Sequence, residues 1–190
     1  MYKLKIITST IRPGRKGPLI AKWVLEQVIA GNLFEAELLE LGEINLPMMN
    51  EPNHPVQMNY QHEHTKWWSS KINEADTFIF VTAEYDFNYP APLRNALEYL
   101  FNEWTYKPAG IVSYGGQSAG LRAVNSLKAD LSTFKVVPLQ ETVSFTFFAK
   151  YLTQDGKFVP EQDAGQKLNT LLKELLRWTK GLEAIRNNAL

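Results

Sequence analysis

The sequence predicts an α/β protein with a doubly wound, parallel, five-stranded sheet and helices on both faces. Five apolar β-type runs alternate with five helical patterns along the chain, which is the pattern of this fold class. One run is continuously apolar, as is typical of a strand that is buried on both faces. The chain of 190 residues has the length of one domain, and no repeat or linker divides it. We therefore expect a single domain over residues 1–190.

The first part of the chain supplies two strands with a helix between them. Residues 3–8 are predicted to form the first strand, and residues 35–41 alternate between polar and apolar positions as a second strand. Between them, a helix with one broad apolar face begins at Pro18 and ends at Gly31. The segment 42–60 is rich in Pro, Asn and Met and is predicted to be a long excursion. Its methionines either line an acceptor pocket or cap the core.

The middle of the chain repeats the alternation of helices and strands. Residues 61–75 are predicted to be helical, and the continuous apolar run at 76–83 is the best candidate for a central strand. Large apolar residues at helical spacing predict a helix over 91–104. A fourth strand is expected at 109–114, followed by a helix at 118–131.

The last part of the chain supplies the fifth strand and a closing helix. We predict the strand at 135–139, a turn at Asp155-Gly156 and a long helix near 161–185. In doubly wound folds, ligands bind outside the carboxyl ends of the strands, near the point where the strand order reverses. The loops that follow the strands are therefore the candidates for a functional site.

The loop after the first strand has the composition of an anion site. Residues 9–18 contain hydroxyls, glycines and the three cations Arg12, Arg15 and Lys16, and a helix follows. Free backbone N–H groups at a helix N-terminus favour an anion, and hydroxyl and guanidinium groups can bind its oxygens. The loop contains neither a Walker A motif nor GxGxxG. The alternative is an ordinary Gly/Pro connection.

Two further loops follow the third and fourth strands. Residues 83–92 interleave aromatic and polar side chains, which suits a flat ring system with polar edges. The alternative there is a hydrophobic anchor before a helix that starts near Pro92. Residues 113–120 contain paired glycines, which allow the backbone to approach a ligand closely or to turn steeply into the next helix. Each loop alone is ambiguous, but all three converge on one crevice in the predicted sheet.

The charge distribution points to a small anionic ligand. The chain has 20 Lys and Arg against 20 Asp and Glu, and this zero net charge argues against nucleic-acid or acidic-membrane partners. Residues 1–31 nevertheless carry six Lys and Arg against one Glu, a local net charge of +5. A few solvated lysines are the alternative explanation, and we favour it for Lys3 and Lys5.

Other chemistries are excluded by what the sequence lacks. The absence of cysteine excludes a disulfide framework, a thiolate zinc site and a cysteine nucleophile. No metal site is predicted, since the pair His62 and His64 does not share a helix face. No run reaches the ~18 apolar residues of a membrane span, and the N-terminus does not read as a signal peptide, so we expect a cytoplasmic protein.

Three segments of the chain, STIRPGRKGPLIAKWV, EYDFNYPAPLRNALEYL and SYGGQSAGLRA, carry a family resemblance. Through them the sequence resembles the NADPH-dependent FMN reductase family, flavodoxin-like proteins that include quinone, azo-dye and chromate reductases. The similarity covers most of residues 3–145 and implies the strand order 2-1-3-4-5. In the family the first loop begins Gly-Ser-x-Arg. Here Thr10 keeps the hydroxyl, Arg12 keeps the cation and Ser9 replaces the glycine.

The resemblance implies an FMN site that is built from the three loops. The first loop would hold the phosphate, the second would pack along the isoalloxazine ring, and the third would flank its pyrimidine end. The implied FMN-binding residues are Ser9, Thr10, Arg12, Arg15, Gly17, Pro18, Leu19 and Ile20, then Glu84, Tyr85, Asp86, Phe87 and Asn88, and finally Ser113, Tyr114, Gly115 and Gly116.

The implied activity is reduction of flavin, quinone or azo-type acceptors by NADPH or NADH in a ping-pong cycle, with hydride transfer through flavin N5. Because the hard chemistry belongs to the cofactor, no side chain is predicted to be catalytic, and Tyr85 or Asn88 beside N5 would be the first candidates. The resemblance also implies a homodimer or a tetramer. A flavodoxin-type electron carrier is one alternative, although such carriers are usually strongly acidic. A flavin-binding regulator without turnover is the other.

Overall fold

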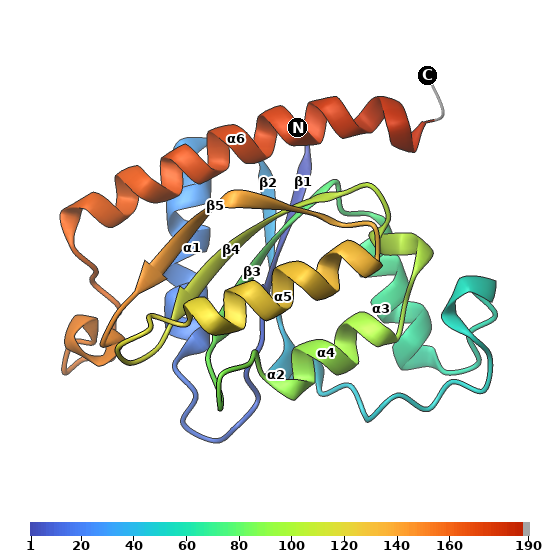
Figure 1. The fold of residues 1–190 in the computed structure, drawn as a ribbon, viewed down its shortest axis with the longest axis horizontal. Helices are drawn as coiled ribbons and strands as arrows, with labels where there is room; N and C mark the ends of the chain where they lie inside the picture. The colour runs from blue at the N-terminus through green and yellow to red at the C-terminus, as the bar shows by residue number, and fades with distance from the viewer. Residues whose placement is uncertain (188–190) are drawn as a thin grey trace.

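The computed structural model describes residues 1–187 and contains one five-stranded sheet in which every neighbouring pair of strands is parallel. The strand order is β2-β1-β3-β4-β5 (Figure 1), so the predicted doubly wound topology is confirmed. The strands are β1 (Lys3–Thr8), β2 (Glu35–Glu40), β3 (Thr77–Ala83), β4 (Pro108–Tyr114) and β5 (Val137–Phe145).

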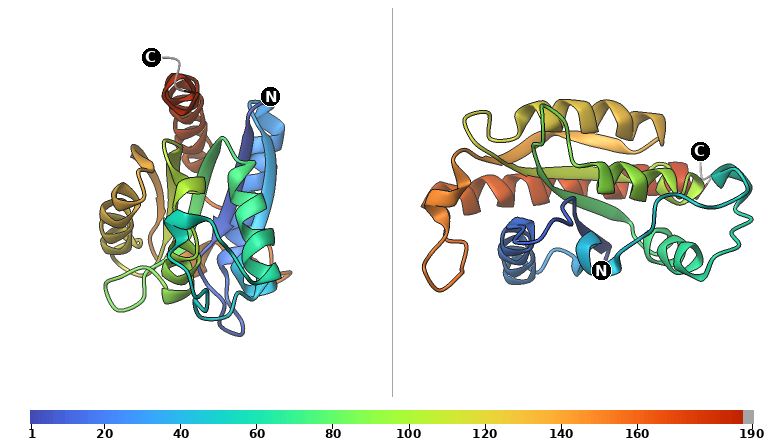
Figure 2. Two further views of the ribbon diagram at one scale, coloured as in Figure 1. Left: turned by 90° about the vertical axis from the view of Figure 1, so that its right-hand side faces the viewer. Right: turned by 90° about the horizontal axis from the view of Figure 1, so that it is seen from below.

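Helices cover both faces of the sheet. On one face, α1 and α6 pack against the strands and against each other. On the other face lie α3, α4 and α5. In the right-hand view of Figure 2, β4 and β5 pass between α5 and α6. The helices are α1 (Gly17–Gly31), α2 (Leu41–Ile44), α3 (Glu63–Asn73), α4 (Ala91–Glu98), α5 (Leu121–Thr133) and α6 (Gln162–Arg186).

The central strand β3 is buried along its whole length because helices cover both of its faces. Its side chains therefore belong alternately to two separate cores. In one core, Trp104 contacts Phe78 at a centroid distance of 5.0 Å and Trp68 at 6.2 Å. The prediction of a central strand at 76–83 is confirmed.

The helix predicted over 91–104 is too long. Helix α4 ends at Glu98, and a short 3-10 helix, η2 (Asn102–Trp104), follows it. At the end of α4 the Leu97 carbonyl accepts from the Leu100 N–H at 3.3 Å and from the Trp104 indole Nε1 at 3.2 Å. The turn through η2 places the fully buried Trp104 ring against the end of α4, an arrangement that the apolar spacing alone did not indicate.

Two other segments differ from the expectation. Strand β5 runs from Val137 to Phe145, whereas the prediction placed it at 135–139; Pro138 lies within it, opposite Ala109, and the register shifts between Ala109 and Ile111. As an edge strand, β5 tolerates a residue without an N–H donor. The excursion 42–60 contains the short helix α2 and a 3-10 helix, η1 (Pro55–Gln57).

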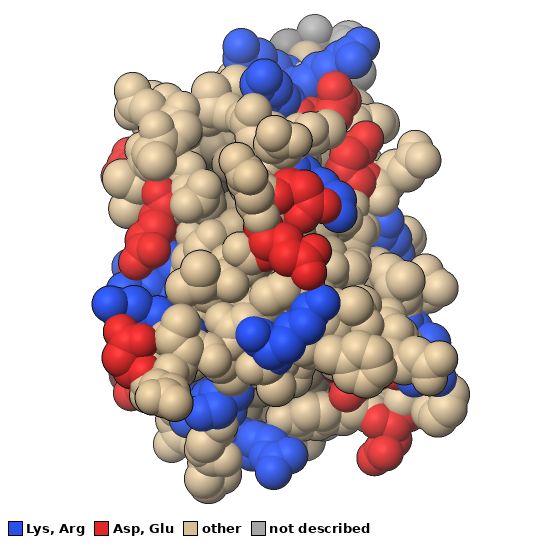
Figure 3. All heavy atoms as spheres, turned by 90° about the vertical axis from the view of Figure 1, so that its left-hand side faces the viewer, with Lys and Arg blue, Asp and Glu red and all other residues tan. Residues whose placement is uncertain are grey.

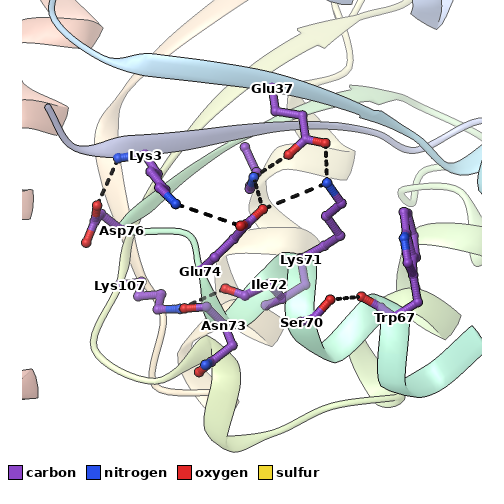
Figure 4. A network of polar contacts seen from close by, with 11 residues as sticks. Lys3, Glu37, Trp67, Ser70, Lys71, Ile72, Asn73, Glu74, Asp76 and Lys107 are labelled. Atoms are coloured by element: carbon purple, nitrogen blue, oxygen red, sulfur yellow. Dashed lines mark hydrogen bonds and ion pairs between the residues drawn. The ribbon is translucent and has the colours of Figure 1, made fainter. Parts of the chain in front are cut away.

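A network of ion pairs joins β1, β2 and α3 (Figure 4). Lys5 of β1 is buried between Glu37 and Glu74, and Lys71 also donates to Glu37 at 2.6 Å. Below this network, Lys107 donates to two backbone carbonyls at the end of α3, those of Ile72 and Asn73. Burial lowers the pKa of Lys107 to about 7. These lysines have structural partners within the fold.

The positive charge of residues 1–31 is less concentrated in space than along the chain. Lys3, Lys5 and Arg15 form ion pairs with carboxylates that follow residue 31. On the face shown in Figure 3, acidic and basic side chains are interspersed. Within residues 1–187, no helix is both long enough and apolar enough to cross a membrane.

Candidate functional site

The three predicted loops meet around one cavity at the carboxyl ends of β1, β3 and β4. Its volume is about 320 Å³, and the first loop forms one wall while the second and third loops form the others. This position agrees with the general location of ligand sites in doubly wound folds. The lining residues are Arg12, Gly14, Arg15, Lys16, Ala83, Glu84, Tyr85, Tyr114, Gly115, Gly116 and Phe148.

The first loop presents two cations without carboxylate partners. Within the described part of the chain, Arg12 and Lys16 form no ion pair, and both side chains are exposed at the cavity. Arg15 differs from them, because its Nε donates to Glu40 at 2.6 Å and its Nη2 to Glu43 at 2.8 Å. The free positive charge at the cavity therefore comes from Arg12 and Lys16.

The N-terminus of α1 faces the same loop and has no side-chain cap and no acidic residue in its first turn. Its partial positive charge therefore adds to that of the two cations. Pro18 has no N–H to donate, and the N–H groups of Leu19 and Ile20 are directed at the Lys16 carbonyl at 3.1 and 3.5 Å. The side chain of Ile20 is fully buried in the core, so any contact that Ile20 makes with a ligand comes from its backbone.

A buried hydroxyl without a hydrogen-bond partner lies beside this helix. Thr10 Oγ1 has no partner among residues 1–187. A β-carbon on Gly17 would lie 2.8 Å from Thr10 Oγ1 and 2.8 Å from the Tyr114 hydroxyl oxygen, so both hydroxyls face the helix start. Burial raises the pKa of Tyr114 to about 12, which keeps its phenol protonated as a donor. The Thr10 hydroxyl, the free cations and a helix N-terminus together form the donor set that a phosphate requires.

Ser9 lies beneath the cavity and closes the base of the loop. Its N–H donates to the Val81 carbonyl at 3.1 Å, and its Oγ accepts from the Ala83 N–H at 3.3 Å. Because its side chain is fully buried, Ser9 holds the ends of β1 and β3 together.

The second loop is a tight two-residue hairpin. Tyr85 and Asn88 exchange backbone hydrogen bonds of 2.8 and 2.9 Å, and between them Asp86 and Phe87 have φ values of +46° and +69°. Two consecutive positive φ angles are the signature of a type I′ turn. Of the four residues, Tyr85 lines the cavity.

Glu84, which precedes the hairpin, connects β3 to the start of α5. Its carboxylate accepts from Ser118 Oγ at 2.8 Å and from Arg122 Nε at 2.6 Å. Burial acts to raise the pKa of Glu84, but the hydrogen bonds from Arg122 and Ser118 outweigh it and lower that pKa. Glu84 is therefore an ionised structural link, and the sequence contained no signal for this partnership.

The third loop contributes Tyr114 and two glycines to the cavity wall. Ser113 lies below it, since its Oγ is hydrogen-bonded to the Ala119 carbonyl and to Ser144 Oγ, both at 2.8 Å. Phe148 packs edge-to-face on Tyr114 at a centroid distance of 5.0 Å. Sequence reasoning missed Phe148 because the predicted fifth strand ended too early to place residues 145–148 at a strand end.

The structure thus divides the predicted residues into three groups. Those that line the cavity are Arg12, Arg15, Glu84, Tyr85, Tyr114, Gly115 and Gly116. Those placed directly behind its wall are Thr10 and Gly17. Those outside the lining are Ser9, Pro18, Leu19, Ile20, Asp86, Phe87, Asn88 and Ser113. Lining residues that were not predicted are Gly14, Lys16, Ala83 and Phe148.

A smaller, mainly apolar cavity of about 110 Å³ borders the other side of the first loop at Ile11. Met48 from the excursion lines it, together with Pro92 at the start of α4. Met49 instead packs against the core, and Met58 is exposed. The methionines of the excursion therefore serve different purposes.

Sequence comparison identifies relatives over most of the chain. The sequence profile of the NADPH-dependent FMN reductase family matches residues 2–150. An NAD(P)H-dependent FMN reductase of Schizosaccharomyces pombe is 44% identical over 120 residues, which cover 62% of this chain and 60% of that protein. An NAD(P)H-dependent FMN reductase of a Nectria species is 31% identical over 201 aligned residues, which cover 95% of this chain and all of that protein.

A solved structure shares the fold. The flavoenzyme NAD(P)H:(acceptor) oxidoreductase of Paracoccus denitrificans matches with a TM-score of 0.75 at 19% identity. The match covers 95% of this chain and 98% of that chain.

Proposed function

Because the chain belongs to the NADPH-dependent FMN reductase family, we propose that it binds FMN in the cavity between the three loops and reduces flavin, quinone or azo-type acceptors with NAD(P)H. One observation carries the placement of the phosphate. Two unpaired cations, an uncapped helix N-terminus and an unpartnered buried hydroxyl meet at one wall of the cavity.

The residues of the first loop have the task of binding the phosphate. Arg12 and Lys16 neutralise its charge, and the Thr10 hydroxyl and the backbone at Gly17 supply hydrogen bonds. Arg15 takes a lesser part, since Glu40 and Glu43 already occupy its guanidinium group.

The residues of the other two loops orient the ring and exclude water from it. Tyr85 and Tyr114 are aromatic side chains that line the cavity, and Gly115 and Gly116 leave space for close approach of a planar group. Bound FMN would supply the hydride chemistry itself. NAD(P)H and the acceptor then use the same open side of the cavity in turn, which is a ping-pong cycle.

The reductase proposal is tested by anaerobic spectroscopy of the purified protein. FMN is added, the visible spectrum is recorded, and NADPH and then a quinone follow. We expect a flavin band that NADPH bleaches and the quinone restores. A bound flavin that NADPH cannot bleach would indicate an electron carrier or a regulator instead. Absence of FMN binding would rule out every flavin function.

The proposal includes a homodimer. Several large apolar side chains of the segment 48–67 are exposed, which is the kind of surface that a partner covers. They are Met48, Val56, Met58 and Trp67. Light scattering coupled to size exclusion measures the molar mass directly, and a monomeric mass at micromolar concentration would contradict this part of the proposal.

A further inference from the structure

Arg122 of α5 contacts the second loop at two separate points. At the base of the loop, its Nε donates to Glu84 Oε1 at 2.6 Å and its backbone N–H donates to Glu84 Oε2 at 3.2 Å. At the tip, the centre of its guanidinium group lies 3.8 Å from the ring centroid of Phe87. One side chain therefore spans the loop from the strand end to the turn.

The turn requires such support. Asp86 and Phe87 both have positive φ, a conformation that non-glycine residues adopt rarely and an aromatic residue more rarely still. Residues in such conformations persist when the surrounding structure determines them. The Phe87 side chain is 66% exposed, so core packing does not hold it. The guanidinium group stacked on its ring is the contact that covers it.

We propose that Arg122 is a positioning residue that holds loop 84–88 in the conformation in which Tyr85 forms a wall of the FMN cavity. This inference rests on the proposed function for its consequence in flavin binding, but not for its consequence in loop rigidity. Arg122 does not line the cavity, so its effect on a ligand passes through the loop. Arg122 acts on the part of the cavity where the second loop would contact the isoalloxazine ring of FMN. The first loop, on another side of the cavity, would bind the phosphate.

The variant Arg122→Gln is expected to fold. Its side chain is about half exposed, and Ser118 continues to donate to the Glu84 carboxylate at the base of the loop. A matched control is Arg177→Gln, which removes a guanidinium group that is 81% exposed on α6 and pairs only loosely with Glu174 at 3.7 Å. Both variants lose one surface cation, but Arg122 alone contacts the loop.

The first measurement compares FMN with riboflavin, which lacks the phosphate. Fluorescence titration of Arg122→Gln should give dissociation constants that rise about tenfold for both ligands, the scale of one lost charged contact. The loss is shared because the loop contacts the ring that both ligands carry. Arg177→Gln should change neither constant. Unchanged constants for both ligands in Arg122→Gln, or a rise for FMN alone, would overturn the inference.

The second measurement needs no flavin. Amide hydrogen exchange at Tyr85 and Asn88, whose N–H groups pair across the hairpin, should speed up about tenfold in Arg122→Gln, consistent with a local loss of stability on the scale of a charged contact. Exchange in the core strand β3 should stay as in the parent. Equal exchange at the hairpin in both proteins would refute the positioning role even if the protein binds no flavin. If β3 also exchanges faster, Arg122→Lys replaces it, since lysine keeps the charge opposite Glu84 but stacks less well on Phe87.

A double-mutant cycle separates the two contacts. Phe87→Leu removes the stacked ring and leaves Glu84 in place. If the ring contact acts through Arg122, Phe87→Leu should weaken riboflavin binding in the parent and have much less effect in Arg122→Gln. Additive losses would show that the Phe87 ring acts independently of Arg122. That result would contradict a role for the stacking contact in holding the loop.

Discussion

Gly17 and Thr10 are so close that a β-carbon on Gly17 would lie 2.8 Å from Thr10 Oγ1, shorter than β-carbons in proteins normally allow. The same β-carbon would lie 2.8 Å from the hydroxyl oxygen of Tyr114. The start of α1 thus meets Thr10 and Tyr114 at a point where any larger residue would displace at least one of the two hydroxyls. This contact brings the two hydroxyls against the helix N-terminus that we propose for the phosphate.

Gly17→Ala should weaken FMN binding at least about tenfold, because Thr10 or Tyr114 must move to admit the methyl group. Fluorescence titration measures the dissociation constant. Gly31→Ala is the control, since a β-carbon at Gly31 meets no atom within 4 Å. Equal affinities in the parent protein and Gly17→Ala would show that this contact is unimportant for the ligand.

Arg12→Ala should weaken FMN binding by about 1.5–3 kcal/mol, the range for a hydrogen bond to a charged group. Riboflavin has no phosphate, so its dissociation constant should stay the same. Lys22→Ala removes an exposed cation of α1 that does not line the cavity and should leave both constants unchanged. An equal loss for FMN and riboflavin would place Arg12 near the ring instead of the phosphate.

Lys107 should make the stability of the protein depend on pH. Burial lowers its pKa to about 7, whereas the pKa in the unfolded chain is about 10.4. Between these values the unfolded chain binds more protons than the folded protein does, so the free energy of unfolding should rise with pH from about 7 to 10. Urea denaturation across this range measures the slope. Lys107→Met should flatten it, and an identical slope in both proteins would contradict the assignment.

Trp104→Phe should destabilise the protein by about 1–3 kcal/mol, because the buried Leu97 carbonyl loses the indole donor and the core loses volume. Trp178→Phe is the matched control on α6, where the indole is partly exposed. Thermal or urea unfolding compares the two variants. A change as small as that of Trp178→Phe would mean that the Trp104 hydrogen bond contributes little.

Local patterns predicted the parts of the fold that depend on neighbouring residues. β3 and α1 were identified by the continuous apolar run at 76–83 and by the apolar face of residues 18–31. Strand and helix periodicities depend on residues that are close together in the sequence. The prediction was wrong where a distant contact decides the outcome. The helix predicted over 91–104 stops at Glu98, after which the chain turns so that the Trp104 indole reaches the Leu97 carbonyl. Strand β5 continues past Pro138 in its pairing with β4.

The same division holds for the candidate site. The sequence by itself determined the alternation of strands and helices and the three loops that border the cavity, because a strand, a helix or a loop is specified by residues that are neighbours in the chain. The strand order was implied by the family resemblance. Only the tertiary structure decided which cations are free. Arg15 is paired by carboxylates that lie 25 and 28 residues further along the chain, whereas Lys16 beside it reaches the cavity. The tertiary structure also pairs Glu84 with Arg122, 38 residues apart, because the fold brings these two side chains together.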